Sequence, residues 1–216
     1  MINHTLDILE QHDVEATFFA THQTQVLDRI HHNGSMECGI HPNFNKALSA
    51  QENKSYSAVI DELLSIVPNA VSERAHCLTQ NTLISFELSR RGLKYDLNTY
   101  IPLSAGMPLR PYRTFSGLLS IPFFFEDDIY FFYQNEKSPV KEYFTADGIK
   151  VFNFHPIHIF INTGSLDLYE HAKPFLHETP KLREMINKGF GAKDFLLSVI
   201  NYGKKYNYRF KTINQI

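Results

Sequence analysis

The sequence has little of what marks several common protein classes. It contains no tryptophan, only two cysteines and no apolar run long enough to span a membrane. Two cysteines cannot form a disulfide framework, so we interpret Cys38 and Cys77 as buried thiols in a reducing compartment. The first residues, MINHTLDILEQHD, lack the cationic and then apolar stretches of a signal peptide. These absences predict a cytoplasmic protein without a membrane span.

An excess of charge of one sign is also absent. The 21 lysines and arginines nearly balance the 23 aspartates and glutamates, and no block of like charges occurs. This distribution argues against electrostatic binding to nucleic acid or to an anionic bilayer. The length of 216 residues and the apolar content of 43% are ordinary for a globular protein with a sizeable core. We therefore expect a single domain over residues 1–216.

Helix and strand patterns alternate through the first hundred residues. Helices are predicted around residues 6–12, 24–32, 56–67 and 81–92, the last capped by Asn81 and closed by Gly92. Strands are predicted at 16–21, 36–40, 70–76 and 93–97, and a polar loop at 41–55. Strands that alternate with helices indicate a parallel sheet, open or closed, in an α/β fold.

The second half of the sequence is less regular. Four prolines fall within residues 98–133, which predicts loops with one or two irregular strands. Regular patterns return as a strand over 149–155, a helix over 192–204 and a final strand in the alternating segment YRFKTI, residues 208–213.

Several polar side chains stand at or just after the predicted strand ends. They are His41, Arg74, His76, Asp96, the run Glu126, Asp127 and Asp128, and His155. In parallel α/β folds, ligands bind at the carboxyl ends of the strands. Imidazole and carboxylate groups bind Zn²⁺, and an open coordination position lets the metal activate water. The pattern therefore predicts a metal-dependent hydrolase.

The same segments resemble the polysaccharide deacetylases, carbohydrate esterase family four, and in particular the divergent members from surface-polysaccharide gene clusters. The matching segments are LDILEQHDVEATFFAT, MECGIHPNF, ERAH, VFNFHP and the closing DFLLSVINYGKKYNYRFKTINQI. The resemblance covers nearly the whole chain apart from its middle section. It implies an irregular (β/α) barrel, a divalent metal, with zinc the expected ion, and an N-acetylated carbohydrate substrate.

The resemblance also implies a role for each matching residue. In the family, metal-bound water attacks the N-acetyl carbonyl of a sugar, and one aspartate and two histidines hold the metal. His41 matches the first metal histidine, and Arg74 matches the arginine that orients the catalytic base. His155 matches the late histidine that protonates the leaving amine. From the residues alone, His155 is equally a buried, hydrogen-bonded histidine, and we interpret nearby His158 as structural.

Three departures from the family pattern accompany these matches. Asn45 stands where the second metal histidine is expected, and His76 stands where the family usually has proline. His76 either replaces the missing ligand or packs beside Arg74. The strand with the two catalytic aspartates should precede the first helix, where this sequence has only MINHT. We expect that strand upstream of Met1, or else a domain that has lost catalysis.

Other polar positions keep two interpretations. Asn45 and Asp96 are predicted to contact substrate, and Asp96 is also compatible with a turn. Residues 126–128 are predicted to form a solvated turn between aromatic strands. The alternative is that one of their carboxylates stands in for a missing one at the site.

Three functions remain open on the sequence. The first is a metal-dependent deacetylase acting on N-acetylated sugars of a surface polysaccharide or its precursor. The second is a catalytically degenerate carbohydrate-binding or scaffold domain on the same barrel, as the departures at Asn45 and the first strand suggest. The third is another hydrolase of this fold that acts on non-sugar C–N bonds.

Overall fold

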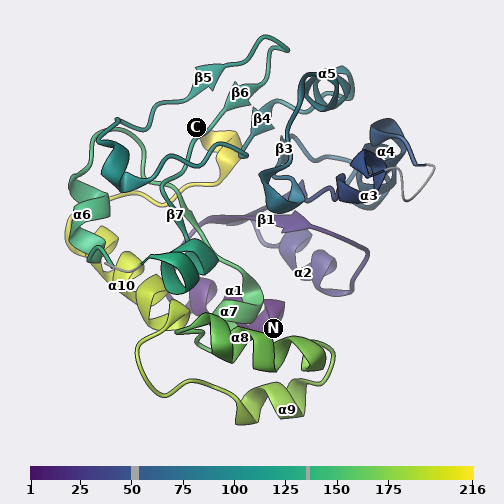
Figure 1. The fold of residues 1–216 in the computed structure, drawn as a ribbon. Helices are drawn as coiled ribbons and strands as arrows, with labels where there is room; N and C mark the ends of the chain where they lie inside the picture. The colour runs from purple at the N-terminus through teal and green to yellow at the C-terminus, as the bar shows by residue number, and fades with distance from the viewer. Residues whose placement is uncertain (50–53, 135–136) are drawn as a thin grey trace. The chain divides into compact units, whose positions relative to one another are not determined.

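A computed structural model describes residues 1–49, 54–134 and 137–216 of the chain (Figure 1). The chain divides into two compact units. Unit 1 comprises Met1–Val14, Ile101–Leu109 and Phe123–Phe210. Unit 2 comprises Glu15–Tyr100, Arg110–Pro122 and Lys211–Ile216. Each unit is described by itself below.

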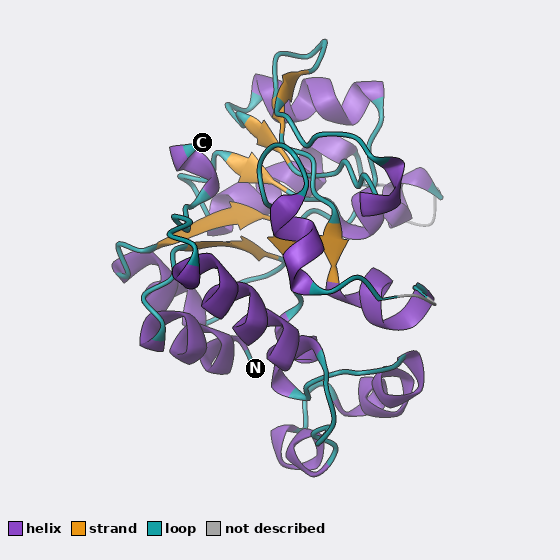
Figure 2. Cartoon of the chain, turned by 90° about the vertical axis from the view of Figure 1, so that its left-hand side faces the viewer, coloured by secondary structure: helices purple, strands orange, loops and turns teal. Residues whose placement is uncertain are grey.

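The described part of unit 2 contains a six-stranded sheet, whose strands are drawn as orange arrows in Figure 2. In spatial order the strands are β1 (Ala16–Ala20), β2 (Met36–Ile40), β3 (Ser72–Glu73), β4 (Tyr95–Asp96), β6 (Leu119–Ser120) and β5 (Tyr112–Arg113). All neighbouring pairs are parallel except β5 and β6, which form an antiparallel hairpin. The predicted α/β class with a parallel sheet is confirmed.

The helices of unit 2 follow the predicted pattern closely. They are α2 (Val26–His32), α3 (Asn45–Leu48), α4 (Tyr56–Ile66) and α5 (Thr82–Arg90), with 3₁₀ turns at His76–Leu78 and Ile213–Gln215. The side chain of Asn81 accepts a hydrogen bond from the Ile84 amide at 2.9 Å, so the predicted cap is confirmed. Helix α3 lies within the predicted loop 41–55, of which residues 50–53 lie outside the described residues.

Close packing between β2 and β3 depends on Gly39. A Cβ atom at this position would lie 2.5 Å from Ser72 Oγ and 2.8 Å from the ring of Phe19. The ladder continues past the strands, because the His41 amide donates to Ala20 O at 2.8 Å and the Arg74 amide donates to Ile40 O at 3.1 Å. The strand ends that carry the predicted polar residues are therefore fixed side by side.

Unit 1 is mainly helical. Its elements are α1 (Ile2–Gln11), a 3₁₀ turn at Leu103–Ala105, β7 (Phe125–Glu126), a π-helical turn (Ile129–Tyr133), α6 (Val140–Thr145), β8 (Phe152–Asn153), α7 (Pro156–Phe160), α8 (Leu166–Ala172), a 3₁₀ turn at Lys173–Phe175, α9 (Thr179–Glu184) and α10 (Ala192–Lys205). Strands β7 and β8 pair in parallel. Among the described residues, no helix is both long and apolar enough to cross a membrane.

Aromatic side chains form much of the core of unit 1. The rings of Phe125 and Phe195 stack at 4.4 Å between centroids with planes 6° apart, and Tyr143 packs edge-on against both. Such pairs stabilise a fold beyond the apolar area they bury. This packing fixes β7, and with it the polar residues that follow it.

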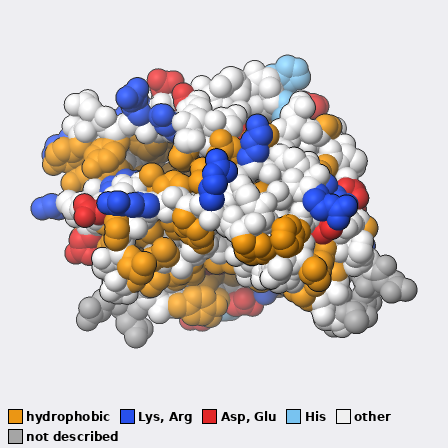
Figure 3. All heavy atoms as spheres, turned by 90° about the horizontal axis from the view of Figure 1, so that it is seen from above, with side chains coloured by type: hydrophobic (Ala, Val, Ile, Leu, Met, Phe, Trp, Pro, Cys, Tyr) orange, Lys and Arg blue, Asp and Glu red, His pale blue; other side chains and the backbone are white. Residues whose placement is uncertain are grey.

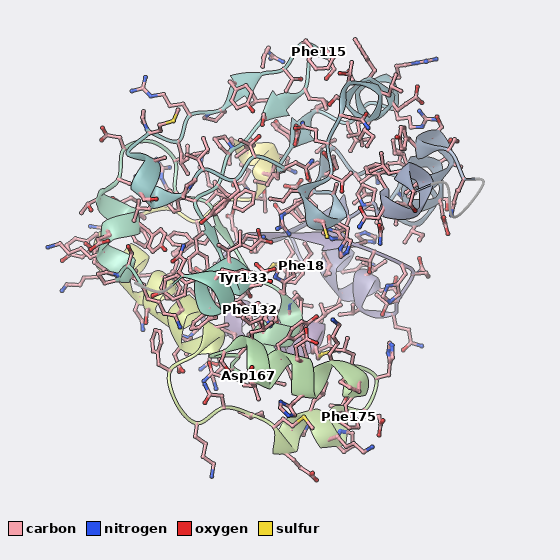
Figure 4. All side chains as sticks on the ribbon, in the orientation of Figure 1. Phe18, Phe115, Phe132, Tyr133, Asp167 and Phe175 are labelled. Atoms are coloured by element: carbon pink, nitrogen blue, oxygen red, sulfur yellow. The ribbon has the colours of Figure 1, made fainter. Side chains whose placement is uncertain are left out.

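One exposed aromatic contact lies on unit 2. Phe115 lies at the tip of the β5–β6 hairpin (Figure 4). Its ring centroid is 5.2 Å from that of Phe86 on α5, and both rings are exposed. On the face seen in Figure 3, lysine and arginine side chains are scattered among apolar and neutral ones.

Three sequence-based expectations are corrected. The segment 208–213, expected as a final strand, forms no strand, although all its residues are described. The strand expected over 149–155 is limited to Phe152–Asn153. Cys38 is buried as expected, but Cys77 is exposed because it lies in the turn after β3.

Candidate functional site

His41 and His76 lie together at the strand ends of unit 2. His41 directly follows β2 and is half-buried, and His76 follows β3 and is exposed. Their ring centroids are 5.9 Å apart, with the planes at 77°. Both line a cavity of about 560 Å³, together with Thr21, His22, Gln23, Asn43, Ala47, Lys54, Val59, Glu62, Leu63 and Ile66. The two predicted metal histidines therefore share one cavity.

A buried polar network lies behind the segment Glu73–His76. Asn98 Nδ2 donates to Glu73 Oε1 at 2.5 Å and to Asp96 Oδ1 at 2.9 Å, while Asn98 Oδ1 accepts from the Ala75 amide at 2.7 Å. Asn98 thus ties the segment that carries Arg74 to the end of β4. Asp96 also accepts from Gln80 Nε2 and is fully buried. These contacts of Asp96 are structural, and its contact with substrate remains a prediction.

Glu73 is a residue that sequence reasoning missed. It is fully buried, and burial together with the neighbouring Asp96 carboxyl raises its pKa well above the ordinary value, although Asn98 and Arg74 act in the other direction. Its Oε2 atom has no hydrogen-bond partner among the described residues. Burial raises the pKa of Asp96 as well. Two buried carboxyls in register on β3 and β4 favour a protonated Glu73.

Asn45 braces the turn that follows His76. Its Oδ1 accepts from Thr79 Oγ1 at 3.2 Å, and its Nδ2 lies 3.9 Å from Cys77 Sγ. Cys77 and Leu78 both have positive φ angles, 54° and 53°, a conformation that L residues rarely adopt. Asn45 does not line the cavity that holds His41 and His76. The structure therefore gives Asn45 contacts to the turn, and substrate contact remains a prediction.

In unit 1, Asp127 and His155 form a close pair. Asp127 Oδ1 lies 2.6 Å from His155 Nδ1, and Asp127 Oδ2 accepts from the His155 amide at 2.7 Å. Glu126 Oε1 lies 3.8 Å from His155 Nε2. His155 stands just before α7, whose first residue, Pro156, needs no amide partner at that position.

The expected solvated turn at residues 126–128 is wrong. Asp127 is 1% exposed and Glu126 is 6% exposed, while half-buried Asp128 accepts from the Ile129 amide at 2.6 Å. The local sequence reads as polar, but the partner that permits burial of Asp127 is His155, 28 residues away.

The charge state of Asp127 follows from its contacts. Burial alone would raise its pKa, but the nearby charge of His155, the hydrogen bonds from that residue and His158 together hold the pKa below the ordinary value. Asp127 is therefore an acceptor-only carboxylate, and His155 Nδ1 must be the donor. His158 is buried, its Nδ1 lies 3.0 Å from Thr163 Oγ1, and burial lowers its pKa.

Among the described residues, the side chains that could hold a metal ion as a group of three lie in unit 1. Catalytic zinc sites use three protein ligands. Among the described residues, the groups of three or more donor atoms within 4.8 Å are Asp127, His155 and His158, and Glu126, Asp128 and His155. No such group includes His41 or His76, which together offer two imidazoles. The described residues around His41 thus supply an incomplete ligand set.

Comparisons with known proteins agree with this fold. A sequence model of the WbmS-like family, described as polysaccharide deacetylase, matches residues 1–173. No curated protein matches the chain. A crystal structure from Bordetella bronchiseptica, described as a polysaccharide deacetylase involved in O-antigen biosynthesis, has 34% identity and a TM-score of 0.87 over 93% of this chain and 84% of its own. A polysaccharide deacetylase structure from Mycobacterium smegmatis has 15% identity and a TM-score of 0.47 over 96% of this chain and 78% of its own. From the family match and the Bordetella structure, the chain belongs to the WbmS-like polysaccharide deacetylase family.

Proposed function

We propose that the protein is a hydrolase that removes the acetyl group from an N-acetylated sugar of a surface polysaccharide or its precursor. Membership of the family and the described role of the Bordetella protein in O-antigen biosynthesis support the substrate class. The observation that carries the reaction is the pairing of Asp127 with His155, 2.6 Å apart.

Hydrolysis of an amide expels an amine, which leaves readily only after it gains a proton. Because Asp127 accepts from His155 Nδ1, the Nε2 atom of His155 is the one that exchanges a proton with substrate. The buried carboxylate stabilises the imidazolium form and fixes the ring, as in other aspartate–histidine pairs. A positioned general acid contributes roughly 10²- to 10⁴-fold to a rate.

Arg74 has a positioning role in this proposal. Its backbone is held by the ladder to Ile40 and by the Asn98 contact to the next residue, Ala75. The Arg74 side chain is 6% exposed. A planar guanidinium can orient a carboxylate through paired hydrogen bonds, and this is the role proposed for Arg74 toward the base.

His41 and His76 are the residues that we propose hold a divalent metal, with zinc the expected ion. When bound, such an ion lowers the pKa of a water molecule and polarises a carbonyl. Two imidazoles leave the ligand set one short of the usual three, so we expect weak binding by the described residues alone.

The proposal is tested by acetate release from a panel of N-acetylhexosamine glycosides and O-antigen polysaccharides, with zinc present and after chelation. We expect release that His155→Ala abolishes and that a chelator stops. His171→Ala is the matched control, because His171 is exposed on α8 and its Nδ1 atom lies 2.7 Å from Asp167 O of the same helix. A folded protein that binds these sugars and releases no acetate would instead be a carbohydrate-binding domain.

A further inference from the structure

We infer that unit 2 binds the surface of an anionic lipid bilayer through α5 and the β5–β6 hairpin. The surface that makes this contact is called the hairpin face below. It comprises Leu83, Phe86, Arg90, Lys94, Arg113 and Phe115. The inference does not depend on the proposed reaction.

The hairpin face exposes large apolar side chains. Leu83, Phe86 and Arg90 occupy positions i, i+3 and i+7 of α5, which form one stripe along a helix. Leu83 is 64% exposed and Phe115, whose ring contacts Phe86, is 66% exposed. Single exposed apolar residues are ordinary, but exposed rings in contact beside a further apolar side chain are typical of a binding surface.

The turn that carries Phe115 is held in place and projects. The Gly117 amide donates to Thr114 O at 3.0 Å, and Ser89 Oγ of α5 donates to Ser116 O at 2.8 Å. Apart from its chain neighbours, no described atom lies within 4 Å of a Cβ at Gly117, and Figure 4 shows Phe115 at the outer end of the hairpin. A projecting ring can enter a soft layer of lipid head groups, whereas a protein partner would need a hollow that fits it.

Cations from three segments lie on the hairpin face. Arg90 ends α5, Lys94 precedes β4 and Arg113 lies in β5, and all three side chains are exposed. Arg113 is in register with Leu119 of β6, whose amide donates to Lys94 O at 2.8 Å. Lys94 and Arg113 therefore flank the same strand. The sequence shows no block of like charge, because these residues become neighbours only in the fold.

The carboxylates near these cations are paired with another arginine. Arg91 lies 2.5 Å from Glu87 of α5 and 2.5 Å from Asp61 of α4, and Arg90 lies 3.4 Å from Glu87. The other two cations of the hairpin face form no ion pair among the described residues. The excess of positive charge attracts anionic lipid head groups. It also repels the same face of a second copy of the chain, which argues against a symmetric dimer here.

The hairpin face and the cavity of His41 lie at opposite edges of the sheet. His41 follows β2 at its carboxyl end, whereas Lys94 and Phe115 precede β4 and β6 at their amino ends. Strands β2, β3, β4 and β6 are parallel, so these ends belong to opposite edges. A bilayer bound at the hairpin face therefore leaves the cavity open to substrate.

The absence of tryptophan allows a direct test. Phe115→Trp places a single indole at the tip of the hairpin in the full chain. Vesicles of equal parts phosphatidylcholine and phosphatidylglycerol should shift its emission to shorter wavelength, and vesicles of phosphatidylcholine alone should leave it unchanged. Phe190→Trp is the matched control, because Phe190 is also an exposed phenylalanine but lies in unit 1.

Co-sedimentation with the anionic vesicles measures the two contributions separately. We expect Phe115→Ala to weaken binding by at least about tenfold, because an aromatic side chain no longer enters the head groups. Lys94→Ala should weaken binding roughly fivefold, the contribution of one cation near an anionic surface. Lys188→Ala is the control, since Lys188 is exposed in unit 1. Added salt should weaken binding of the wild type.

Several outcomes would overturn the inference. They are no binding to the anionic vesicles, equal binding to both kinds of vesicle, or the same emission shift in Phe190→Trp. A dimer in solution that Phe115→Ala dissociates would also overturn it, since a second copy would then occupy the hairpin face. A wild-type chain that binds these vesicles and releases no acetate contradicts the proposed function alone.

Discussion

Asp127 holds His155 through two atoms at once. One carboxylate oxygen lies 2.6 Å from the imidazole Nδ1, and the other accepts from the His155 amide at 2.7 Å. The ring and its backbone are thus fixed by a single buried carboxylate. Neither residue has to move for Nε2 to exchange a proton with substrate, the role proposed for it.

Asp127→Asn removes the charge that stabilises the imidazolium form of His155. We expect kcat for acetate release to fall by about two orders of magnitude, near the lower end of general-acid contributions. The measurement is kcat as a function of pH. Asp128→Asn is the control, because Asn keeps an oxygen that can accept from the Ile129 amide. Equal losses in both variants would mean that Asp127 acts only through stability.

Asp127 also makes stability depend on pH. Its pKa is lower in the folded chain than in the unfolded chain, so its contribution is present above the unfolded pKa and is lost as pH falls through the folded value. Urea unfolding of the wild type and Asp127→Asn below about pH 4, near the ordinary aspartate pKa, should therefore show their stabilities converging. A difference that is constant with pH would contradict this linkage.

The sequence predicts well what depends on local pattern. The apolar spacing of α4 and the Asn81 cap of α5 each involve residues only a few positions apart in the sequence. Both predictions are confirmed. The positions of His41 and His76 after strands follow from the same patterns. A local pattern cannot show which residue far along the chain will contact a given side chain.

Two errors show this limit. The sequence predicts a solvated turn at Asp127, because no residue near it in the sequence indicates the pairing with His155. The segment from Tyr208 to Ile213 alternates like a strand, but alternation describes a side-chain pattern, and a strand also needs a neighbour for its backbone. No residue of this segment lies in a strand.

Glu73→Gln should stabilise the protein. The pKa of Glu73 is raised in the folded chain, so folding takes up a proton and stability falls as pH rises above the unfolded glutamate value. Glutamine removes that dependence. We expect a gain of about 1–3 kcal/mol near neutral pH, because folding no longer has to protonate this side chain, and almost none below about pH 4. Urea unfolding across pH measures it, with exposed Glu62→Gln as the control.

Gly39→Ala should destabilise unit 2. The new methyl would meet Ser72 Oγ at 2.5 Å and Ser72 O at 2.6 Å, so β2 and β3 would have to separate. We expect a loss of about 1–3 kcal/mol, as in other overpacked sites. Gly34→Ala is the control, because nothing lies within 4 Å of a Cβ there. Thermal unfolding of the two variants gives the comparison. Equal Tm values would show that β2 and β3 can separate at little cost in stability.

His76→Ala tests whether the two imidazoles of unit 2 act together on a metal. The His41 and His76 rings are 5.9 Å apart and line one cavity, so a zinc ion bound there would lose one of its two imidazole ligands. We expect zinc affinity, measured by isothermal titration, to fall by at least tenfold in His76→Ala and in His41→Ala. The control is His31→Ala, since His31 is exposed on α2. If zinc binds equally to all three variants, the ion is held elsewhere, and the donor group of Asp127, His155 and His158 becomes the place to look.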